Sequence, residues 1–182
     1  MSSHEVIALV TDVLRAQLAS ALPPGTQVIV RAPSPDAPAR EGLFVHLLRI
    51  ALAKARRNEV MERRVGASTL LPPLELELDY LVAGLGGEAL GELAMLDATL
   101  QSVSERPMRM HETLGEGLSQ PARWASLASG SLTVRWLLLD VPLEQVAGLW
   151  TACGLRQRPG LWVRAEVQWR AEPPSPAPVI GV

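Results

Sequence analysis

Few side chains in this sequence could do chemistry, and they do not gather into a recognised motif. Histidine occurs at positions 4, 46 and 111. His111 precedes Glu112 but has no second histidine four residues on, so the zinc-protease pattern is absent. His46 alternates with hydrophobic residues, which is typical of a half-buried core histidine. The histidines therefore predict no metal site.

The glycines, serines and cysteine also lack the context that catalysis requires. Gly84-Leu85-Gly86-Gly87 has neither the later glycine nor the Lys-Ser/Thr pair of a phosphate-binding loop. Ser129-Gly130-Ser131 does not form a nucleophile elbow. Cys153, the single cysteine, excludes an intrachain disulfide and is predicted to be a small buried hydrophobe. We therefore expect a protein that is not an enzyme, with no cofactor and no metal.

Two charged clusters could bind a partner instead. Glu75, Glu77 and Asp79 are spaced two residues apart, so they would share one face of a strand. They could bind a cation or a basic surface, but a solvated outer face is the preferred interpretation. Arg56-Arg57 and Arg63-Arg64 form a basic patch that could meet an acidic protein or a phosphate. A solvated loop explains that patch equally well, and the acids at 59 and 62 weaken a nucleic-acid interpretation.

Length and charge narrow the class of protein. The 182 residues fit one domain with a sizeable core. Lysine and arginine number 17 against 19 acids, which gives no global electrostatic reason to bind nucleic acid or a membrane. The N-terminus has no basic segment of a signal peptide, and no apolar run reaches the roughly 18 residues of a membrane span. With a single cysteine, these features predict a protein of the reducing cytoplasm.

Two residue types hint at association. Every cation except Lys54 is arginine, and there are five tryptophans against one phenylalanine and one tyrosine. Arginine and tryptophan are enriched at interface hot spots. High-GC coding would give the same arginine excess and is the preferred explanation, and the tryptophans could fill the core.

The pattern of apolar residues predicts a single α+β domain, with a mainly antiparallel or mixed sheet of about six strands and about three packed helices. The strand at 74–82 is the clearest, because its apolar and polar residues alternate strictly, and the glycines from 84 onward are expected to end it. The run 43–52 is interpreted as an interior strand, with helix as the competing interpretation. Segment 53–69 is expected to be a long exposed connection. The expected helices are 3–20, 88–104 and 143–152, and the other expected strands are 27–31, 108–110, 132–139 and 161–170.

Two of these helices carry more specific expectations. Around the helix at 143–152, Pro142 is expected at the first helical position, Asp140 near the N-cap and Gly154 in the left-handed conformation that follows a helix. For the helix at 88–104, the predicted inward face is Leu93, Leu96, Leu100 and Val103.

The last residues, 171–182, differ in composition from the domain at 1–170. They hold four prolines, which cannot pair along both edges of a sheet or continue a helix. They are interpreted as a Pro-rich C-terminal tail, either disordered or lying as an extended arm on a neighbour. Val179 and Ile180 could anchor such an arm.

Several short motifs in a fixed order carry a resemblance to a known family. They include the strand at 44–52, Arg57-Asn58, the Pro-Leu-x-Leu-x-Leu-x-Tyr-Leu-Val block at 73–82, and the helix ending in Leu149-Trp150 followed by Arg158-Pro159. From 7 to 169 the chain resembles the N-terminal domain of the cap or tail-terminator family of extracellular contractile injection systems, such as Photorhabdus virulence cassettes and the antifeeding prophage. Departures are Gly160 and Trp162, where the family has serine and tyrosine, and Asp79 before Tyr80, where the family has a basic residue.

The resemblance implies a structural protein of a phage-tail-like particle. Such proteins form a ring, typically a hexamer, at the distal end of the inner tube, where they also contact the sheath. The implied partners are therefore other copies of this chain, the inner tube protein and the sheath protein, in a particle assembled in the bacterial cytoplasm. The residues expected at these interfaces are Arg56, Arg57, Arg63, Arg64, Arg158, Trp162, Val179 and Ile180.

Two alternatives stay open. The chain could be another phage-tail component, such as a connector or tube-completion protein. It could also be a ligand-binding or enzymatic domain with a site in its long loops, where His111, Glu112 and Arg123 form the nearest polar cluster.

Overall fold

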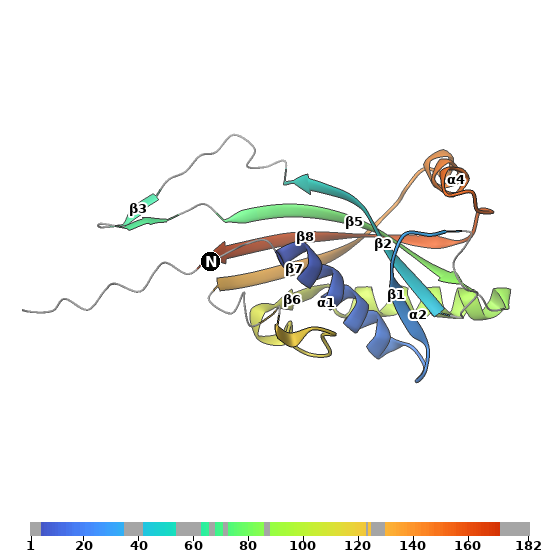
Figure 1. The fold of residues 1–182 in the computed structure, drawn as a ribbon, viewed down its shortest axis with the longest axis horizontal. Helices are drawn as coiled ribbons and strands as arrows, with labels where there is room; N and C mark the ends of the chain where they lie inside the picture. The colour runs from blue at the N-terminus through green and yellow to red at the C-terminus, as the bar shows by residue number, and fades with distance from the viewer. Residues whose placement is uncertain are drawn as a thin grey trace, which may run out of the picture.

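A curled six-stranded sheet forms the frame of the molecule (Figure 1). The structure is a computed structural model that describes residues 5–34, 42–53, 63–65, 68–70, 73–85, 88–122, 124 and 130–171. Its strands are β1 Gln27–Val30, β2 Gly42–Leu52, β5 Leu74–Leu85, β6 Met108–Met110, β7 Gly130–Leu139 and β8 Gly160–Ala171. They lie in the order β1-β2-β5-β8-β7-β6. β1 and β2 pair in parallel and the other neighbours are antiparallel, so the sheet is mixed.

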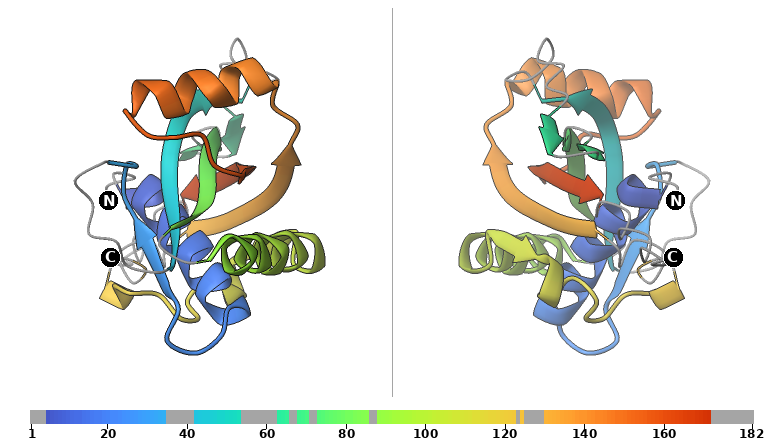
Figure 2. Two further views of the ribbon diagram at one scale, coloured as in Figure 1. Left: turned by 90° about the vertical axis from the view of Figure 1, so that its right-hand side faces the viewer. Right: turned by 90° about the vertical axis from the view of Figure 1, so that its left-hand side faces the viewer.

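Helices cover both faces of this sheet. α1 Val6–Ala21 and α2 Ala89–Glu105 lie on one face, called here the inner face, and α4 Leu143–Ala152 lies on the opposite, outer face (Figure 2). A short 3₁₀ turn, η3 His111–Thr113, follows β6. This arrangement confirms the predicted α+β domain. In the part of the chain that the structure describes, no helix is long and apolar enough to cross a membrane.

α1 forms because apolar residues recur along it every three or four positions and face the sheet. Val10, Leu14 and Leu18 are fully buried, and Ile7 packs partly buried against the same core. The helix stops at Leu22, whose extended backbone precedes Pro23. A residue before proline disfavours the helical region, which explains the boundary.

A buried glutamine ties α1 to α2 and β7. Gln17 donates from Nε2 to the carbonyl of Ser102 at 3.0 Å and to that of Arg106 at 3.2 Å, both at the C-terminal end of α2. Its Oε1 accepts from Nε1 of Trp136 at 3.2 Å. Because both ends of the amide are satisfied, Gln17 can lie in the core without the cost of an unpaired polar group.

β5 is the strand that the alternation predicted, and it is longer than expected. Leu76, Leu78, Tyr80 and Val82 are buried on the inner face. The strand does not end at Gly84 but continues to Leu85, which pairs with Gly42. A side chain at Gly84 would place its Cβ 3.0 Å from that of Glu92, so the glycine allows α2 to approach the sheet closely.

The expected exposed connection at 53–69 contains a hairpin that the sequence analysis missed. β3 Arg63–Val65 and β4 Ser68–Leu70 pair in an antiparallel ladder. Figure 1 shows this hairpin beyond the ends of β2 and β5, away from the six-stranded sheet. Residues 54–62 and 66–67 of that connection lie outside the described residues.

α2 faces the sheet with a different stripe from the predicted one. Leu93 and Leu100 are 47% and 40% exposed, so their predicted burial is wrong. The helix is rotated so that two small polar residues replace them, and Thr99 satisfies its hydroxyl by donating to the carbonyl of Met95 at 3.0 Å. The buried residues are Met95, Leu96, Thr99, Ser102 and Val103.

The start of α4 also differs from expectation, by one residue. Pro142 is the N-cap rather than the first helical residue, because its carbonyl accepts from the backbone N–H groups of Gln145 and Val146 at 2.9 and 3.2 Å. Asp140 therefore lies too far upstream to cap the helix. Gly154 follows the helix with φ of +66°, which confirms the predicted left-handed position.

Candidate interaction surface on the outer face

The cross-strand register divides the outer face of the sheet into rows of neighbouring side chains. From α4 toward the far end of β5, the rows change from apolar to ion-paired and then to open and polar. The first row is His46, Leu81, Trp162 and Leu139; the second is Arg49, Asp79, Arg164 and Leu137; the third is Ala51, Glu77, Glu166, Arg135 and Met108; the fourth is Glu75, Gln168, Thr133 and Met110.

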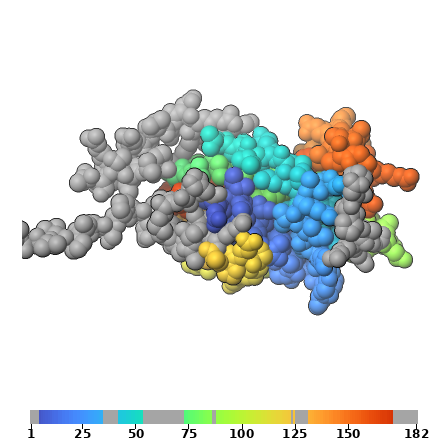
Figure 3. All heavy atoms as spheres, in the orientation of Figure 1, coloured from blue at the N-terminus to red at the C-terminus, as the bar shows by residue number. Residues whose placement is uncertain are grey.

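α4 closes the apolar part of the outer face. Its Trp150 is fully buried and meets Phe44 edge-on, with ring centroids 6.0 Å apart. Leu81 and Ala83 of β5 are buried in the same small cluster. In the space-filling view α4 forms a knob at this end of the molecule (Figure 3). This part of the face is therefore covered by the chain itself.

A β-bulge in β2 makes the step from the apolar row to the ion-paired row. The register shifts between Leu47 and Arg49, so two consecutive residues oppose one residue of β5. Leu48 packs against the cluster under α4, while Arg49 pairs with Asp79. The bulge thus places an apolar and a charged side chain next to each other on one face.

The ion-paired row is a network centred on one carboxylate. Asp79 accepts from Nε of Arg49 at 2.8 Å and from Nε and Nη2 of Arg164 at 2.7 and 3.1 Å. Glu77 accepts from Nη2 of Arg49 at 3.0 Å and lies 3.5 Å from Nη1 of Arg164. Asp79 is only 8% exposed, so the interpretation of this acidic face as fully solvated is wrong at that residue. Two arginines that are distant in sequence cover it.

The network also sets the protonation of Asp79. Burial by itself would raise the pKa of this carboxyl, but hydrogen bonds from Arg164 and then Arg49, with their positive charges, outweigh it and hold the pKa below the usual 3.8. Asp79 therefore stays ionised in the folded protein. The same contacts raise the pKa of Arg164. The two arginines are balanced by Asp79 together with Glu77 of the next row, which favours a role in holding β2, β5 and β8 in register.

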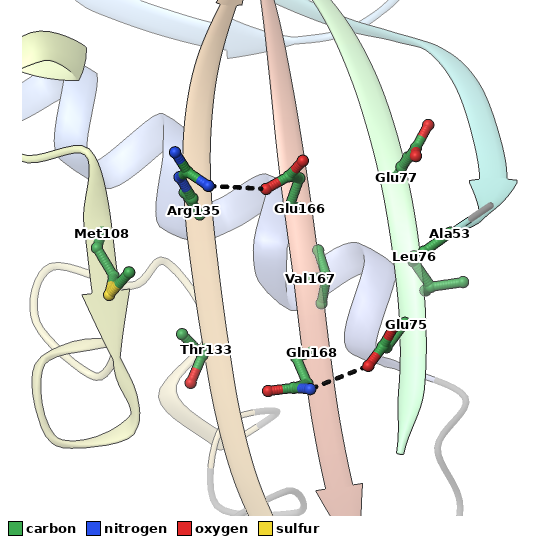
Figure 4. Close-up of a pocket in the computed structure, with 10 residues that line it drawn as sticks. All are labelled: Ala53, Glu75, Leu76, Glu77, Met108, Thr133, Arg135, Glu166, Val167 and Gln168. Carbon is green, nitrogen blue, oxygen red and sulfur yellow. Dashed lines mark hydrogen bonds and ion pairs between the residues drawn. The ribbon is translucent and has the colours of Figure 1, made fainter. Parts of the chain in front are cut away.

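Beyond the network the outer face is open. A groove of about 500 Å³ runs over the third and fourth rows, and we call it the outer groove (Figure 4). Figure 4 shows Glu75 and Glu77 on β5, Glu166 and Gln168 on β8, and Arg135 on β7 lining it. Met108 of β6 closes its far side and is 46% exposed.

The outer groove can recognise charged and polar groups. Glu75 accepts from Gln168 at 3.0 Å, and Arg135 lies 3.6 Å from Glu166. Within the described ranges, no group of three or more His, Cys, Asp or Glu residues is placed to hold a metal ion. The carboxylates and the guanidinium group that line the outer groove suit contacts with a polar protein surface.

The structure places only some of the predicted interface residues. Arg158 donates to Glu92 of α2 at 2.6 Å, which anchors the loop before β8. Trp162 is half-buried in the cluster under α4. Arg63 and Arg64 belong to β3, of which the backbone alone is described. Arg56, Arg57, Val179 and Ile180 lie outside the described residues. Their proposed role at an interface stays a prediction.

The loop cluster of the alternative interpretation is only partly visible. His111 packs against Trp124 with ring centroids 4.6 Å apart, while Glu112 is exposed and Arg123 lies outside the described residues.

Cys153 was predicted to be buried, but it is only half-buried in the structure. The reason is its position at the C-cap of α4.

The residues that sequence reasoning missed are three arginines and one acid on β2, β8 and β7. Arg49, Arg164, Arg135 and Glu166 are spread over three strands, and the register alone brings them together. Alternation in β8 carries a usable signal, because Arg164, Glu166 and Gln168 repeat at every second residue.

Comparison with known proteins gives one family match. The model of the Pvc16 N-terminal domain matches residues 6–180. No curated protein matches the chain in sequence.

Two solved structures share the fold. One is the PVC sheath/tube terminator in its extended state, from an extracellular contractile injection system, with a TM-score of 0.67 and 14% identity over 97% of this chain and 61% of that chain. The other is the tube-terminating cap of the anti-feeding prophage, with a TM-score of 0.58 and 13% identity over 95% of this chain and 58% of that chain. The chain thus spans about three fifths of the length of each.

Proposed function

Because the chain belongs to the Pvc16 N-terminal domain family, we propose that it is a structural cap that ends the tube of a contractile injection system. The observation that carries the proposal is the family match over 6–180, which spans almost the whole sequence. Two proteins named as tube terminators or caps share its fold, one of them also named a sheath terminator. The proposed role is assembly, without catalysis.

In its finer form, the proposal is a closed homo-oligomeric ring, a hexamer, that contacts the inner tube protein and the sheath protein. A ring needs a heterologous interface that closes on itself. Residues 1–170 would form the ring domain, and residues 171–182, with Val179 and Ile180, would act as an arm on a neighbouring subunit. The particle would assemble in the cytoplasm of the producing bacterium.

Binding to tube ends tests this function. Purified protein carrying a gold label would be mixed with isolated inner tubes that lack their own cap, and negative-stain images would be scored for label position. We expect label at one end of each tube, because a terminator recognises the last ring and not the wall. Tubes that are already capped provide the matched control and should stay unlabelled.

Light scattering on the same sample measures the mass of the assembly, and therefore the number of subunits in the proposed ring. A mass of about six subunits, in solution or on tube ends, supports the finer proposal. Label along the tube wall, or none on open ends, would contradict a terminator and favour another tail component.

A further inference from the structure

α2 is rotated so that three of its leucines face solvent. Leu90, Leu93 and Leu100 are 77%, 47% and 40% exposed. In their place the helix buries Thr99 and Ser102, and the Ser102 hydroxyl has no hydrogen-bond partner in the part of the chain that the structure describes. Burial of apolar surface is the main source of stability, so this rotation is unfavourable for a chain on its own. A conflict of this kind between sequence and packing is expected where a surface serves a partner.

Two of these leucines lie on the flank of α2 that is turned away from α1. Ala94 and Ala98 line the cleft between α2 and the turn that follows α1. An α-helix turns about 100° per residue, so Leu93 and Leu100 lie on a different side from the two alanines. α2 contacts β7, and Figure 2 shows the end of β7 on the same side of the molecule as α2, away from β1. The exposed leucines therefore accompany the end of β7.

The end of β7 has a strand neighbour on one side only. β6 pairs with residues 133–135, and the carbonyl of Pro107 then accepts from the N–H of Trp136 at 2.7 Å. Proline has no N–H to return, so the Trp136 carbonyl gains no bond from it. In an antiparallel ladder the backbone groups of every second residue point to the same side, so the N–H and C=O of Leu138 face this open side too. Among the described residues, none pairs with Leu138 there.

Leu138 joins the open edge to the flank of α2. It pairs with Val163, which is buried in the core of the inner face, so both side chains lie on the face that α2 covers. Leu138 is nevertheless 39% exposed, because neither β6 nor α2 covers it completely. The open edge of β7 therefore combines unpaired backbone groups with apolar side chains on its inner side.

The charge beside this edge is negative. α2 and its N-cap contain four acids and no cation: Glu88, Glu92, Asp97 and Glu105. Within the described ranges, only Glu92 has an ion-pair partner, which is Arg158. Arg106, just after the helix, donates to Ser20 of α1 instead. Two copies that met through this surface would bring like charges together, so the charge favours a positively charged partner over a second copy.

We propose that the open edge of β7 binds an extended segment of a partner protein, which adds a strand beyond β7, places apolar side chains against Leu93, Leu100 and Leu138, and carries a net positive charge. In this mode of recognition, main-chain hydrogen bonds give affinity and the alternate side chains select the partner. The added strand would also cover an edge that is otherwise open to uncontrolled pairing. This inference goes beyond the proposed cap function, because the edge and its charge are features of the fold alone.

Peptide binding tests the site on the whole protein. Fluorescein-labelled peptides of about eight residues, in which valine alternates with arginine, with serine or with glutamate, would be titrated and followed by fluorescence anisotropy. We expect the arginine peptide to bind at least about tenfold more tightly than the serine peptide, and the glutamate peptide not to bind. Hydrogen exchange with mass spectrometry should show slower exchange at 136–139 when the arginine peptide is bound.

Two variants separate this edge from a general attraction of the peptide to an acidic protein. Leu138→Pro removes an N–H that points out of the sheet, so the bonds between β7 and β8 should remain. Leu93→Ser with Leu100→Ser removes the apolar contacts and keeps every charge. Each variant should bind the arginine peptide at least about tenfold more weakly than the parent. The matched control is Leu143→Ser, which replaces a 67% exposed leucine of α4 and should bind like the parent.

Circular dichroism and the melting temperature check that the variants are folded, and the double serine variant decides alone if Leu138→Pro does not fold. Three outcomes would overturn the inference: no binding by any of the peptides, binding that the folded variants leave unchanged, or binding of the arginine and glutamate peptides with equal strength. Self-association of the parent that Leu138→Pro abolishes would make a second copy the occupant and would also overturn it. No tube is present in these assays, so tube-end labelling decides the proposed function separately.

Discussion

At the scale of single residues, the outer face shows how a sheet can keep a carboxylate ionised while covering it. Asp79 would be costly to bury alone, and its two arginines come from the strands on either side. One of them, Arg49, reaches it through the bulge at Leu48. The carboxylate therefore works as a clamp across β2, β5 and β8.

Replacing Asp79 should remove a contribution to the free energy of unfolding that depends on pH. Asp79→Asn removes the charge but keeps the shape, and we expect a loss of about 2 kcal/mol in the free energy of unfolding at pH 7. The pKa of Asp79 is lowered in the folded state, so its stabilisation is complete above the unfolded value of 3.8 and is lost as pH falls through the folded value. Urea unfolding at pH 7 and pH 2 should show the variant and the parent converging in acid.

The control for this clamp is an exposed acid without a network. Glu144→Gln lies at the exposed start of α4, so it should change stability by less than about 0.5 kcal/mol at either pH. An Asp79→Asn penalty that is equally large at pH 2 would assign the effect to packing and not to charge.

His46 should also make the stability of the protein depend on pH, but in the range near neutral pH. Burial beside Leu81 lowers the pKa of His46 below 6.5, so the folded state resists a proton that the unfolded state accepts. Stability is then lost as pH falls below 6.5 toward the folded value. His46→Leu should show a smaller fall in melting temperature between pH 7.5 and pH 5.5, and an unchanged fall would contradict the assignment.

At the scale of elements, alternation predicts which strands exist but not what covers them. The period of two in β5 identified its inner face correctly, because Leu76, Leu78 and Tyr80 all face the core. The same pattern could not show that α4, about 60 residues later in sequence, covers Leu81. It could not show the bulge that brings Arg49 to Asp79, because the register belongs to strand pairing and not to one strand.

α2 shows a second limit of sequence reasoning. Its apolar residues offer more than one stripe, and the helix buries Thr99 and Ser102 while leaving Leu93 exposed. The Thr99 hydroxyl bonds to the carbonyl of Met95 and is buried at low cost, whereas the buried Ser102 hydroxyl has no hydrogen-bond partner among the described residues. Composition alone therefore does not fix the helix rotation. The sequence pattern predicted that Gly84 ends the strand. In the structure, Gly84 instead allows Glu92 of α2 to approach β5 closely.

α4 should behave as a separately anchored element. Trp150→Ala removes its one fully buried side chain, and we expect a loss of about 3 kcal/mol in the free energy of unfolding. Because the cluster under α4 is separate from the inner core, amide exchange should rise mainly over 143–152 while α1 stays protected. Hydrogen exchange with mass spectrometry measures both.

The matched control on the same helix is Leu143→Ala. Leu143 is 67% exposed, so its removal should cost less than about 0.5 kcal/mol and leave exchange unchanged. A uniform rise of exchange in α1 and α4 after Trp150→Ala would show that the two clusters unfold as one.

At the scale of the whole molecule, the outer face of the sheet is covered at one end and open at the other. α4 closes the outer face at one end, whereas the outer groove is open at the other, beyond the ion-paired row. The hairpin β3–β4 projects from that open end (Figure 1). In the sequence, residues 54–64 carry a net charge of +3 and the other residues a net charge of −5, so charge is unevenly divided along the chain.

If copies associate through these charges, the uneven division predicts how assembly responds to salt. Charges that meet at a partly exposed groove are screened within about 10 Å at 0.1 M salt and about 3 Å at 1 M. The concentration needed for assembly should therefore rise about tenfold between 0.05 and 0.5 M sodium chloride, measured by light scattering. An interface formed by apolar contacts, for example through the exposed Met108 and Met110 of β6, would be unchanged or strengthened by the same salt. A salt-insensitive assembly would place the subunit contact elsewhere on the molecule.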